Sequence, residues 1–491
     1  MSSPLANCPL LDLFNDSITQ LNIDSLSCNE FQPEQNHHHE VLLLVGDIYS
    51  QRHHYQAMVI QQGMVAAIGS EPQMQGYLQE HNLTCNQTLR LSAAKCIVPG
   101  FIQAELDLGT ALATSSWFHL GPFGLQGNWQ QPMPNYNLHY LSRALSYIDK
   151  SLDADEWLLG FGVDLSLLPF SPFLPHSESK EPLSLEFLDS LQLPRPVCIF
   201  DKTAERAFIN SLATMTLYLT LPDEAKRRFA NVRIFSQYIE QQGGLNKDEF
   251  AWILHALPQE QILRATHQTE GALKNIIIQA LSQGVTTLAV SQARQTHPLH
   301  NKVLALFHRM AKTIAEQRGN RVHAIRVLNH KAQPQSADVV YAHPDSLSLD
   351  GYLQMRSQPF SKILPLRQMI TDNKFVVFAS QFPERPLGAL RHFDSAVNRE
   401  MHTAPGYYVG AERHLLPEQR IEMRDALACV TENPAQLIDS PHQLGVLKVG
   451  AAADFVVLSH NIFANPDLLK ECLVEQTWVA GQCSYSLGED C

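Results

Sequence analysis

The stretch CIVPGFI, residues 96–102, divides the sequence into two kinds of pattern. Before it, residues 41–70 hold short β-type runs separated by the turn signals Gly46-Asp47 and Gln62-Gly63. This alternation of runs and turns predicts a meander of hairpins. After it, apolar β-type runs alternate with helical stretches, which is typical of parallel strands in a barrel or a doubly wound sheet. The middle of the chain is therefore predicted to be α/β.

The middle of the chain holds fewer strand-like runs than a closed barrel needs. Runs with the composition of buried strands are Ile97–Ile102, Val197–Phe200, Val285–Val290, Val322–Leu328, Val339–Tyr341 and Phe375–Ala379. Helical stretches are predicted at Leu138–Lys150, Glu270–Gln283 and Asn301–Gln317. A closed barrel of alternating strands and helices has eight strands. An incomplete barrel would leave unpaired edges, which another subunit can cover, so self-association as a homodimer is one expectation.

A second β-rich block closes the chain. Its β-type runs are Leu444–Leu447, Ala453–Leu458 and Val474–Ala480. Because neither terminal block alone buries enough apolar surface, the two are expected to form one small β-sandwich. The predicted organisation is an N-terminal arm at 1–36, a composite β-sandwich at 37–98 plus 440–491, and a barrel at 99–439.

The composition is that of a globular protein, with 491 residues, 45% of them hydrophobic and 17% charged. The 36 Lys and Arg against 49 Asp and Glu give a net charge of −13, which disfavours binding to nucleic acids or anionic membranes. No apolar run is long enough to span a bilayer. The expected partner is a small-molecule ligand or a second copy of the chain.

The cysteines and the N-terminal residues bear on the compartment. The nine cysteines are scattered and form no Cys-x-x-Cys pair, which is typical of reduced thiols in the cytoplasm. The first fifty residues contain no Lys or Arg, whereas a secretory signal begins with cationic residues. We therefore expect a cytoplasmic protein.

Several segments resemble, in order, the motifs of the amidohydrolase superfamily, in particular its amidohydrolase 3 branch, which includes the formamide-deformylase-like hydrolases. They are residues 96–102, 155–162, 201–210, 284–287, 378–383 and 424–458. The resemblance implies a TIM-like (β/α) barrel, complete or incomplete, with a small β-sandwich domain. It also implies a hydrolase acting on non-peptide C–N bonds. In that family, one or two divalent metal ions lower the pKa of a bound water, which attacks the C–N bond.

The resemblance places unsuitable residues at the family's metal positions. The two histidine ligands of the first strand fall on Glu105 and Asp107, and the catalytic aspartate falls on Gln381. An amide side chain neither accepts a proton usefully nor binds zinc well. The resemblance therefore implies a pseudoenzyme with a degenerate metal site, without catalytic activity and without a cofactor.

The alternative is an active hydrolase of a small amide or cyclic imide with a remodelled site. Carboxylates two positions apart on a strand face the same side, so Glu105 and Asp107 could hold one divalent ion, Zn, Mn or Mg. The histidines His343, His392 and His402 are interpreted as packing or surface residues. The residues expected to line the ligand pocket are Glu105, Asp107, Asp201, Glu205, Asn210 and Gln381.

Overall fold

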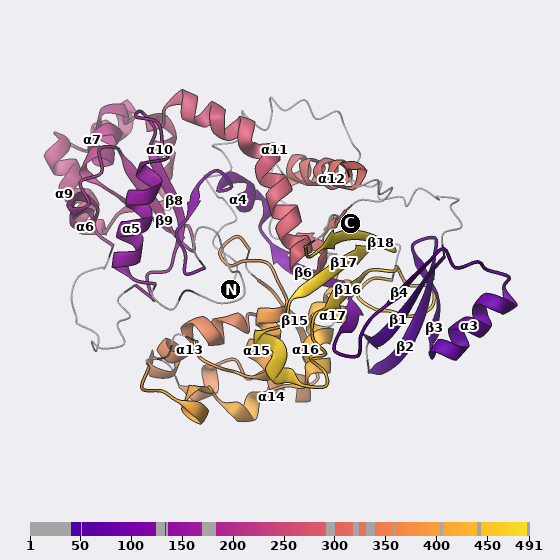
Figure 1. Ribbon diagram of the computed structural model, residues 1–491. Helices are drawn as coiled ribbons and strands as arrows, with labels where there is room; N and C mark the ends of the chain where they lie inside the picture. The colour runs from indigo at the N-terminus through magenta and orange to yellow at the C-terminus, as the bar shows by residue number, and fades with distance from the viewer. Residues whose placement is uncertain are drawn as a thin grey trace.

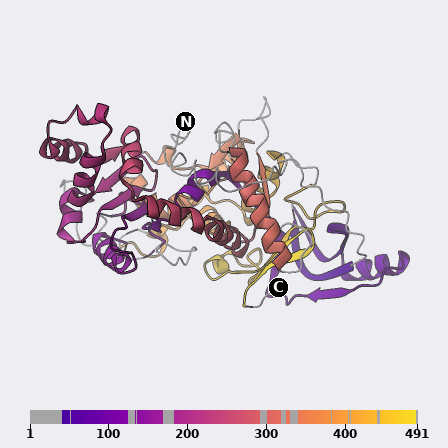
Figure 2. The same ribbon diagram turned by 90° about the horizontal axis from the view of Figure 1, so that it is seen from above.

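The computed structural model describes residues 41–50, 52–123, 133, 136–168, 183–290, 300–317, 324–329, 339–357, 359–380, 382–402, 404, 406–438 and 443–488. The molecule has a sheet built from both chain ends, a central layer of parallel strands, and a separate lobe (Figure 1). Seen from above, the lobe and the N-terminal strands lie at opposite ends of an elongated molecule (Figure 2).

Strands from both ends of the chain form one eight-stranded sheet, with the path β18-β17-β16-β5-β1-β2-β3 and β4 paired with β1. The N-terminal strands are β1 (Val41–Ser50), β2 (His53–Gln61), β3 (Met64–Gly69), β4 (Gln87–Arg90) and β5 (Cys96–Pro99). The C-terminal strands are β16 (Phe455–Leu458), β17 (Val474–Val479) and β18 (Gln482–Ser486). The two groups meet where β5 pairs antiparallel with β16.

The β2–β3 hairpin turns at Gln62 and Gly63, both with positive φ, as the turn signal predicts. Helix α3 (Glu71–Glu80) follows the hairpin and buries Met74 and Leu78. The domain boundaries proposed from the sequence stay a prediction.

The central layer consists of parallel strands. One group is β6 (Phe101–Leu106), β12 (Val285–Val290) and β13 (Arg326–Asn329). A second pair is β14 (Val339–Ala342) and β15 (Phe375–Phe378), which a parallel bridge from Ala104 to Ala379 brings beside β6. The helices after β6 and beside this layer are α4 (Leu108–Ala113), α11 (Gln259–Ser282) and α12 (His300–Gln317).

The lobe contains a second, mixed sheet in the order β11-β10-β9-β8-β7. Its strands are β7 (Phe118–His119), β8 (Leu158–Val163), β9 (Val197–Asp201), β10 (Arg206–Ile209) and β11 (Leu245–Asn246). Its helices are α5 (Leu138–Asp149), α6 (Leu185–Ser190), α7 (Ser211–Thr220), α8 (Asp223–Lys226), α9 (Val232–Gln242) and α10 (Phe250–Ala256). Strands β7, β8 and β9 run parallel, whereas β10 and β11 run antiparallel to their neighbours.

Helices cover the C-terminal side of the central layer. They are α13 (Asp345–Ser357), α14 (Leu366–Thr371), α15 (Leu390–Val397), α16 (Met423–Val430) and α17 (Glu432–Gln436). Helix α15 buries nearly its whole length because it packs between α13 and α16 (Figure 1). This packing brings the residues at its N-terminus close to the ends of β14 and β15.

The mixed α/β class is confirmed, but the described residues contain no closed barrel. The parallel strands are divided between the central layer and the lobe, and no ladder joins the two. After β9 the chain turns back at once into antiparallel β10, so no crossover helix leads to the next parallel strand. The strand pattern alone could not show this, because a buried hairpin strand and a buried barrel strand have similar composition.

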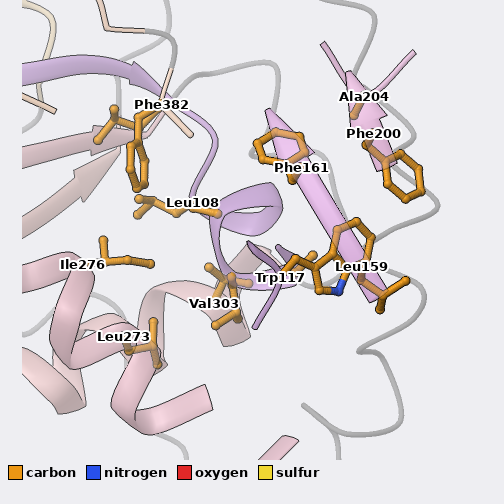
Figure 3. Packing of buried hydrophobic residues seen from close by; sticks show 14 of the residues in the cluster. Leu108, Trp117, Leu159, Phe161, Phe200, Ala204, Leu273, Ile276, Val303 and Phe382 are labelled. Atoms are coloured by element: carbon orange, nitrogen blue, oxygen red, sulfur yellow. The ribbon is translucent and has the colours of Figure 1, made fainter. Parts of the chain in front are cut away.

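The largest apolar core runs from the lobe into the helices beside the central layer. Leu159 on β8, Phe200 on β9, Leu273 on α11 and Val303 on α12 belong to this one buried cluster (Figure 3). Trp117 stacks on Phe200 with ring centroids 4.9 Å apart. The lobe and the central layer are therefore held together by a shared core although their sheets are separate.

Among the described residues, no helix is long and apolar enough to cross a membrane. The described cysteines Cys85, Cys96, Cys198, Cys429 and Cys472 are free thiols. Cys483 is disulfide-bonded, which departs from the expectation that all thiols are reduced.

Candidate functional site

Asp107, at the position of the family's second histidine, caps a helix. It is the N-cap of α4, where its Oδ1 accepts the backbone N–H of Thr110 at 3.0 Å and its Oδ2 accepts the Thr110 hydroxyl at 2.7 Å. The residue is buried. Aspartate is among the preferred N-cap residues because its oxygens satisfy the free N–H groups of the first turn. The geometry therefore gives Asp107 a structural role.

Glu105, at the first histidine position, lies near the end of β6 with a φ of 57°. This left-handed backbone interrupts the regular alternation of the strand, and β6 ends at Leu106, before Asp107. Glu105 contacts Tyr341 on β14: burial raises the pKa of the Tyr341 hydroxyl, and the charge and hydrogen bond of Glu105 raise it further. The regular strand on which the same-face expectation rests is therefore not present at these residues.

The three lobe residues expected in the pocket have structural partners. Asp201 accepts the Thr203 hydroxyl at 2.8 Å and the Glu205 N–H at 2.9 Å, which organises the β9–β10 turn. Glu205 is exposed and lies 3.5 Å from the ammonium of Lys247. Asn210 caps α7, with its side-chain oxygen accepting from Ala213 N–H. Gln381 lies outside the described residues.

Charged side chains gather instead where parallel strands end. Asp164 follows β8 and Lys202 follows β9, and the Lys202 ammonium lies 2.7 Å from the Asp164 carboxylate. The Asp164 side chain is 4% exposed and that of Lys202 21%. The carboxyl ends of parallel strands are where α/β sheets bind ligands.

A second group of charges lies at the ends of β14 and β15. Asp345 begins α13, and its carboxylate lies 3.2 Å from the Arg385 guanidinium, 3.6 Å from His392 Nδ1 and 4.0 Å from Arg391. Burial opposes ionisation of Asp345, but Arg385, His392 and Arg391 outweigh it and hold its pKa at about 2. Burial lowers the pKa of His392 to about 4, helped by Arg391 and opposed by Asp345, so this imidazole is neutral at physiological pH.

Glu384 links the two groups electrostatically. Burial raises the pKa of its carboxyl to about 7, while Arg385 and Lys202 act to lower it and Asp164 and Asp345 act to raise it. A carboxyl with such a pKa is partly protonated near neutral pH, so it can both donate and accept a hydrogen bond. We call Asp164, Lys202, Asp345, Glu384 and Arg385 the carboxyl-end cluster.

A signal in the sequence could have found this cluster. Each of three segments predicted as a strand or as a family motif is closely followed by charged residues: 155–162 by Asp164, 197–200 by Lys202, and 378–383 by Glu384 and Arg385. Polar residues just after parallel strands meet at one edge of a sheet. His343 and His392, interpreted from the sequence as packing or surface residues, lie beside this cluster, and His343 Nδ1 is 2.7 Å from the carbonyl of Ala379.

The residues at the family's metal positions do not fit a metal ion. Both carboxylate oxygens of Asp107 are engaged by Thr110, and Glu105 is engaged by Tyr341. The described parts of the chain contain no cluster of three or more His, Cys, Asp or Glu that could hold one. Within the described ranges, the donors near Glu105 and Asp107 therefore do not form the ligand set that zinc requires.

Residues 338–485 match the amidohydrolase family. Over this part, the chain is similar to that family. The matched residues include β14, β15, the helices after them and the C-terminal strands, and therefore Asp345, Glu384 and Arg385 of the cluster. The recognition of the family from its motifs is confirmed. No curated protein matches the chain at a significant level.

Solved structures of hydrolases are similar to the chain at low TM-scores. A metal-dependent hydrolase from Pyrococcus furiosus is 13% identical with a TM-score of 0.45, covering 86% of this chain and 100% of its own. One from Pyrococcus horikoshii is 15% identical with a TM-score of 0.43, covering 86% and 98%. Guanine deaminase from E. coli is 13% identical with a TM-score of 0.34, covering 92% and 100%. Likenesses at these values establish neither the fold nor the activity.

Proposed function

We propose that this chain is an amidohydrolase-family protein that has lost metal-dependent hydrolysis and keeps a ligand site at the carboxyl ends of its strands. The observation that carries the proposal is the capping role of Asp107. Its two oxygens satisfy the start of α4, so an acidic residue at this position has a structural reason that needs no ion. The Glu105–Tyr341 contact supports the same conclusion at the first position.

We also propose that the central layer and the lobe strands β7–β9 are parts of an opened TIM-like barrel, accompanied by a small β-sandwich. Parallel strands occur in both parts, and residues of the carboxyl-end cluster follow strands of each. The antiparallel strands β10 and β11 occupy the lobe sheet beyond β9. In this arrangement, the carboxyl-end opening of the barrel would lie between the central layer and the lobe.

The carboxyl-end cluster favours a small polar ligand over a purely apolar one. Two carboxylates and two cations lie close to Glu384, whose protonation can adjust to the charge of a ligand. Buried charges are costly unless they are paired, and a polar ligand can complete such pairing. The alternative, an active amide or imide hydrolase built on Glu105 and Asp107, needs both residues to bind an ion in addition to their present partners.

Metal analysis of the full chain tests the proposal. The protein is purified without chelator, incubated with zinc, manganese or magnesium, desalted and analysed for bound metal. We expect substoichiometric metal in every case, with the same value for the Asp107→Asn and Glu105→Gln variants. One ion per chain that is lost in either variant would overturn the proposal and favour the active hydrolase.

A further inference from the structure

A cavity lies on the lobe, at the opposite end of β8 from the carboxyl-end cluster. It has a volume of about 220 Å³. Trp157 at its wall directly precedes β8, whereas Asp164 of the cluster directly follows this strand. The walls come from the segment that leads into β7, the residues just after α5, the start of β8, and α11 with the residue Leu257 before it. The cavity is therefore separate from the site described above.

The cavity combines aromatic and aliphatic walls. Trp117 and Trp157 line it together with Leu159, Leu257 and Ile262. Figure 3 shows Trp117 beside Leu159. An apolar cavity of about 150 Å³ is large enough to bind benzene. The lobe cavity thus has room for one aromatic ring with a small substituent.

Arg264 on α11 supplies the cavity with a buried hydrogen-bond donor. Its Nη1 lies 3.0 Å from the Asp153 carboxylate and its Nη2 lies 3.0 Å from the Glu156 carboxylate. The side chain as a whole is 37% exposed, but its Nε and Nη2 atoms are buried, and neither makes a well-formed hydrogen bond within the described part of the chain. A buried donor without a partner costs about 1–3 kcal/mol. An acceptor bound in the cavity could therefore take the hydrogen bond of the Nε atom.

The charges around Arg264 indicate which kind of acceptor fits. Asp153 and Glu156 already pair with its guanidinium, so an additional anion would meet two carboxylates. A cation could approach the two carboxylates, but it has no lone pair with which to accept the Nε–H hydrogen bond. An uncharged carbonyl oxygen or ring nitrogen satisfies the Nε–H without either conflict.

We propose that this lobe cavity is a binding site for an uncharged aromatic or heteroaromatic molecule of one ring that carries a carbonyl or ring-nitrogen acceptor. The ring lies against the tryptophan and leucine walls, and the acceptor receives the hydrogen bond of Arg264 Nε–H. This site is independent of the proposed function, because none of its residues belongs to the carboxyl-end cluster.

Three probes of equal ring size test the proposal on the full chain by saturation-transfer NMR titration. Acetophenone has a carbonyl acceptor, toluene has none, and benzoate carries a negative charge. We expect acetophenone to bind about tenfold more tightly than toluene, since a hydrogen bond to a charged donor is at the strong end of the range. We expect benzoate to bind more weakly than acetophenone. No binding of acetophenone, or equal binding of all three, would overturn the proposal.

Variants on α11 assign the binding to this cavity. Ala265 lines the cavity, whereas the neighbouring Leu263 is 43% exposed and does not line it. Ala265→Phe should abolish acetophenone binding, and Leu263→Phe, which adds bulk to the same helix, should leave it unchanged. Arg264→Gln leaves the walls in place and should bring acetophenone down to the affinity of toluene. Unchanged acetophenone binding in Ala265→Phe or Arg264→Gln would contradict the assignment.

Discussion

The carboxylate of Asp107 accepts two hydrogen bonds from Thr110, one from its backbone N–H and one from its hydroxyl. The residue that aligns with a metal ligand of the family therefore serves as the N-cap of α4. The cap also accounts for an acidic residue there without any metal: the first turn of α4 is buried, and its N–H groups need an acceptor.

Removal of this cap tests its structural role. We expect Asp107→Ala to lower the free energy of unfolding by about 1 kcal/mol, the usual cost of a lost N-cap. Asp107→Asn keeps an acceptor for the Thr110 N–H and should cost less. Urea unfolding followed by circular dichroism measures both. A loss in Asp107→Asn as large as in Asp107→Ala would show that the charge matters more than the cap.

Local pattern was sufficient for much of the fold. The runs at 285–290 and 375–379 are strands β12 and β15 to within one residue, because continuous apolar runs of this length are buried strands. The helical stretch 301–317 is found as α12 at 300–317. The run at 97–102 is interrupted at Gly100 and contributes β5 to one sheet and β6 to another. Nothing in an apolar run tells which sheet it joins.

The candidate site was harder to predict than the fold. Asp201 and Asn210 stand in a family motif, but each bonds to backbone groups nearby in sequence, as short polar side chains often do. Asp345 and Arg385 are 40 positions apart, and only the packing of α13 beside the end of β15 brings them together. Spacing in the sequence carries no signal for such a pair.

The buried charge of Asp345 should make stability fall at low pH. Its folded-state pKa of about 2 lies below the ordinary value of about 3.9. The unfolded chain therefore binds this proton first, and the contribution of about 2–3 kcal/mol is present above pH 4 and is lost as the pH falls towards 2. Urea unfolding between pH 2 and 6 measures the loss. Asp345→Asn should flatten this part of the profile.

The partner of Asp345 can be tested separately. Arg385→Met leaves the buried carboxylate poorly compensated, and we expect a loss of about 3 kcal/mol at pH 7. The matched control is Arg309→Met, which breaks an exposed pair with Glu270. Exposed pairs contribute about 0–1 kcal/mol. Similar losses in the two variants would mean that Asp345 does not depend on Arg385.

Glu384 should have the opposite pH dependence. Its folded-state pKa of about 7 lies above the ordinary value of about 4.3, so the folded chain holds a proton that the unfolded chain releases. Stability from this group is present below pH 4 and is lost as the pH rises through 7. Glu384→Gln should therefore stabilise the protein by about 1–3 kcal/mol at pH 8 and by little at pH 4. Equal effects of Glu384→Gln on stability at both pH values would contradict a raised pKa of Glu384. Glu80→Gln, at an exposed position, is the control.

The buried pair of Arg326 and Asp454 should be among the most costly to break. Arg326 is on β13, Asp454 precedes β16, and their side chains are 2% and 4% exposed. Asp454 also accepts the backbone N–H of Ala480 at 2.8 Å. The pair thus connects the central layer to the C-terminal strands. This contact gives Asp454, which lies in the family-like segment 424–458, a structural role.

A double-mutant cycle measures this connection. Arg326→Met and Asp454→Asn should each cost about 3–5 kcal/mol, because each leaves a buried group without its counter-charge. The double variant should cost less than the sum, with a coupling of about 1–3 kcal/mol. The partly exposed pair Lys95–Glu475 is the control and should show a coupling below about 1 kcal/mol. Strict additivity at Arg326 and Asp454 would mean that the two sheets are held by apolar packing alone.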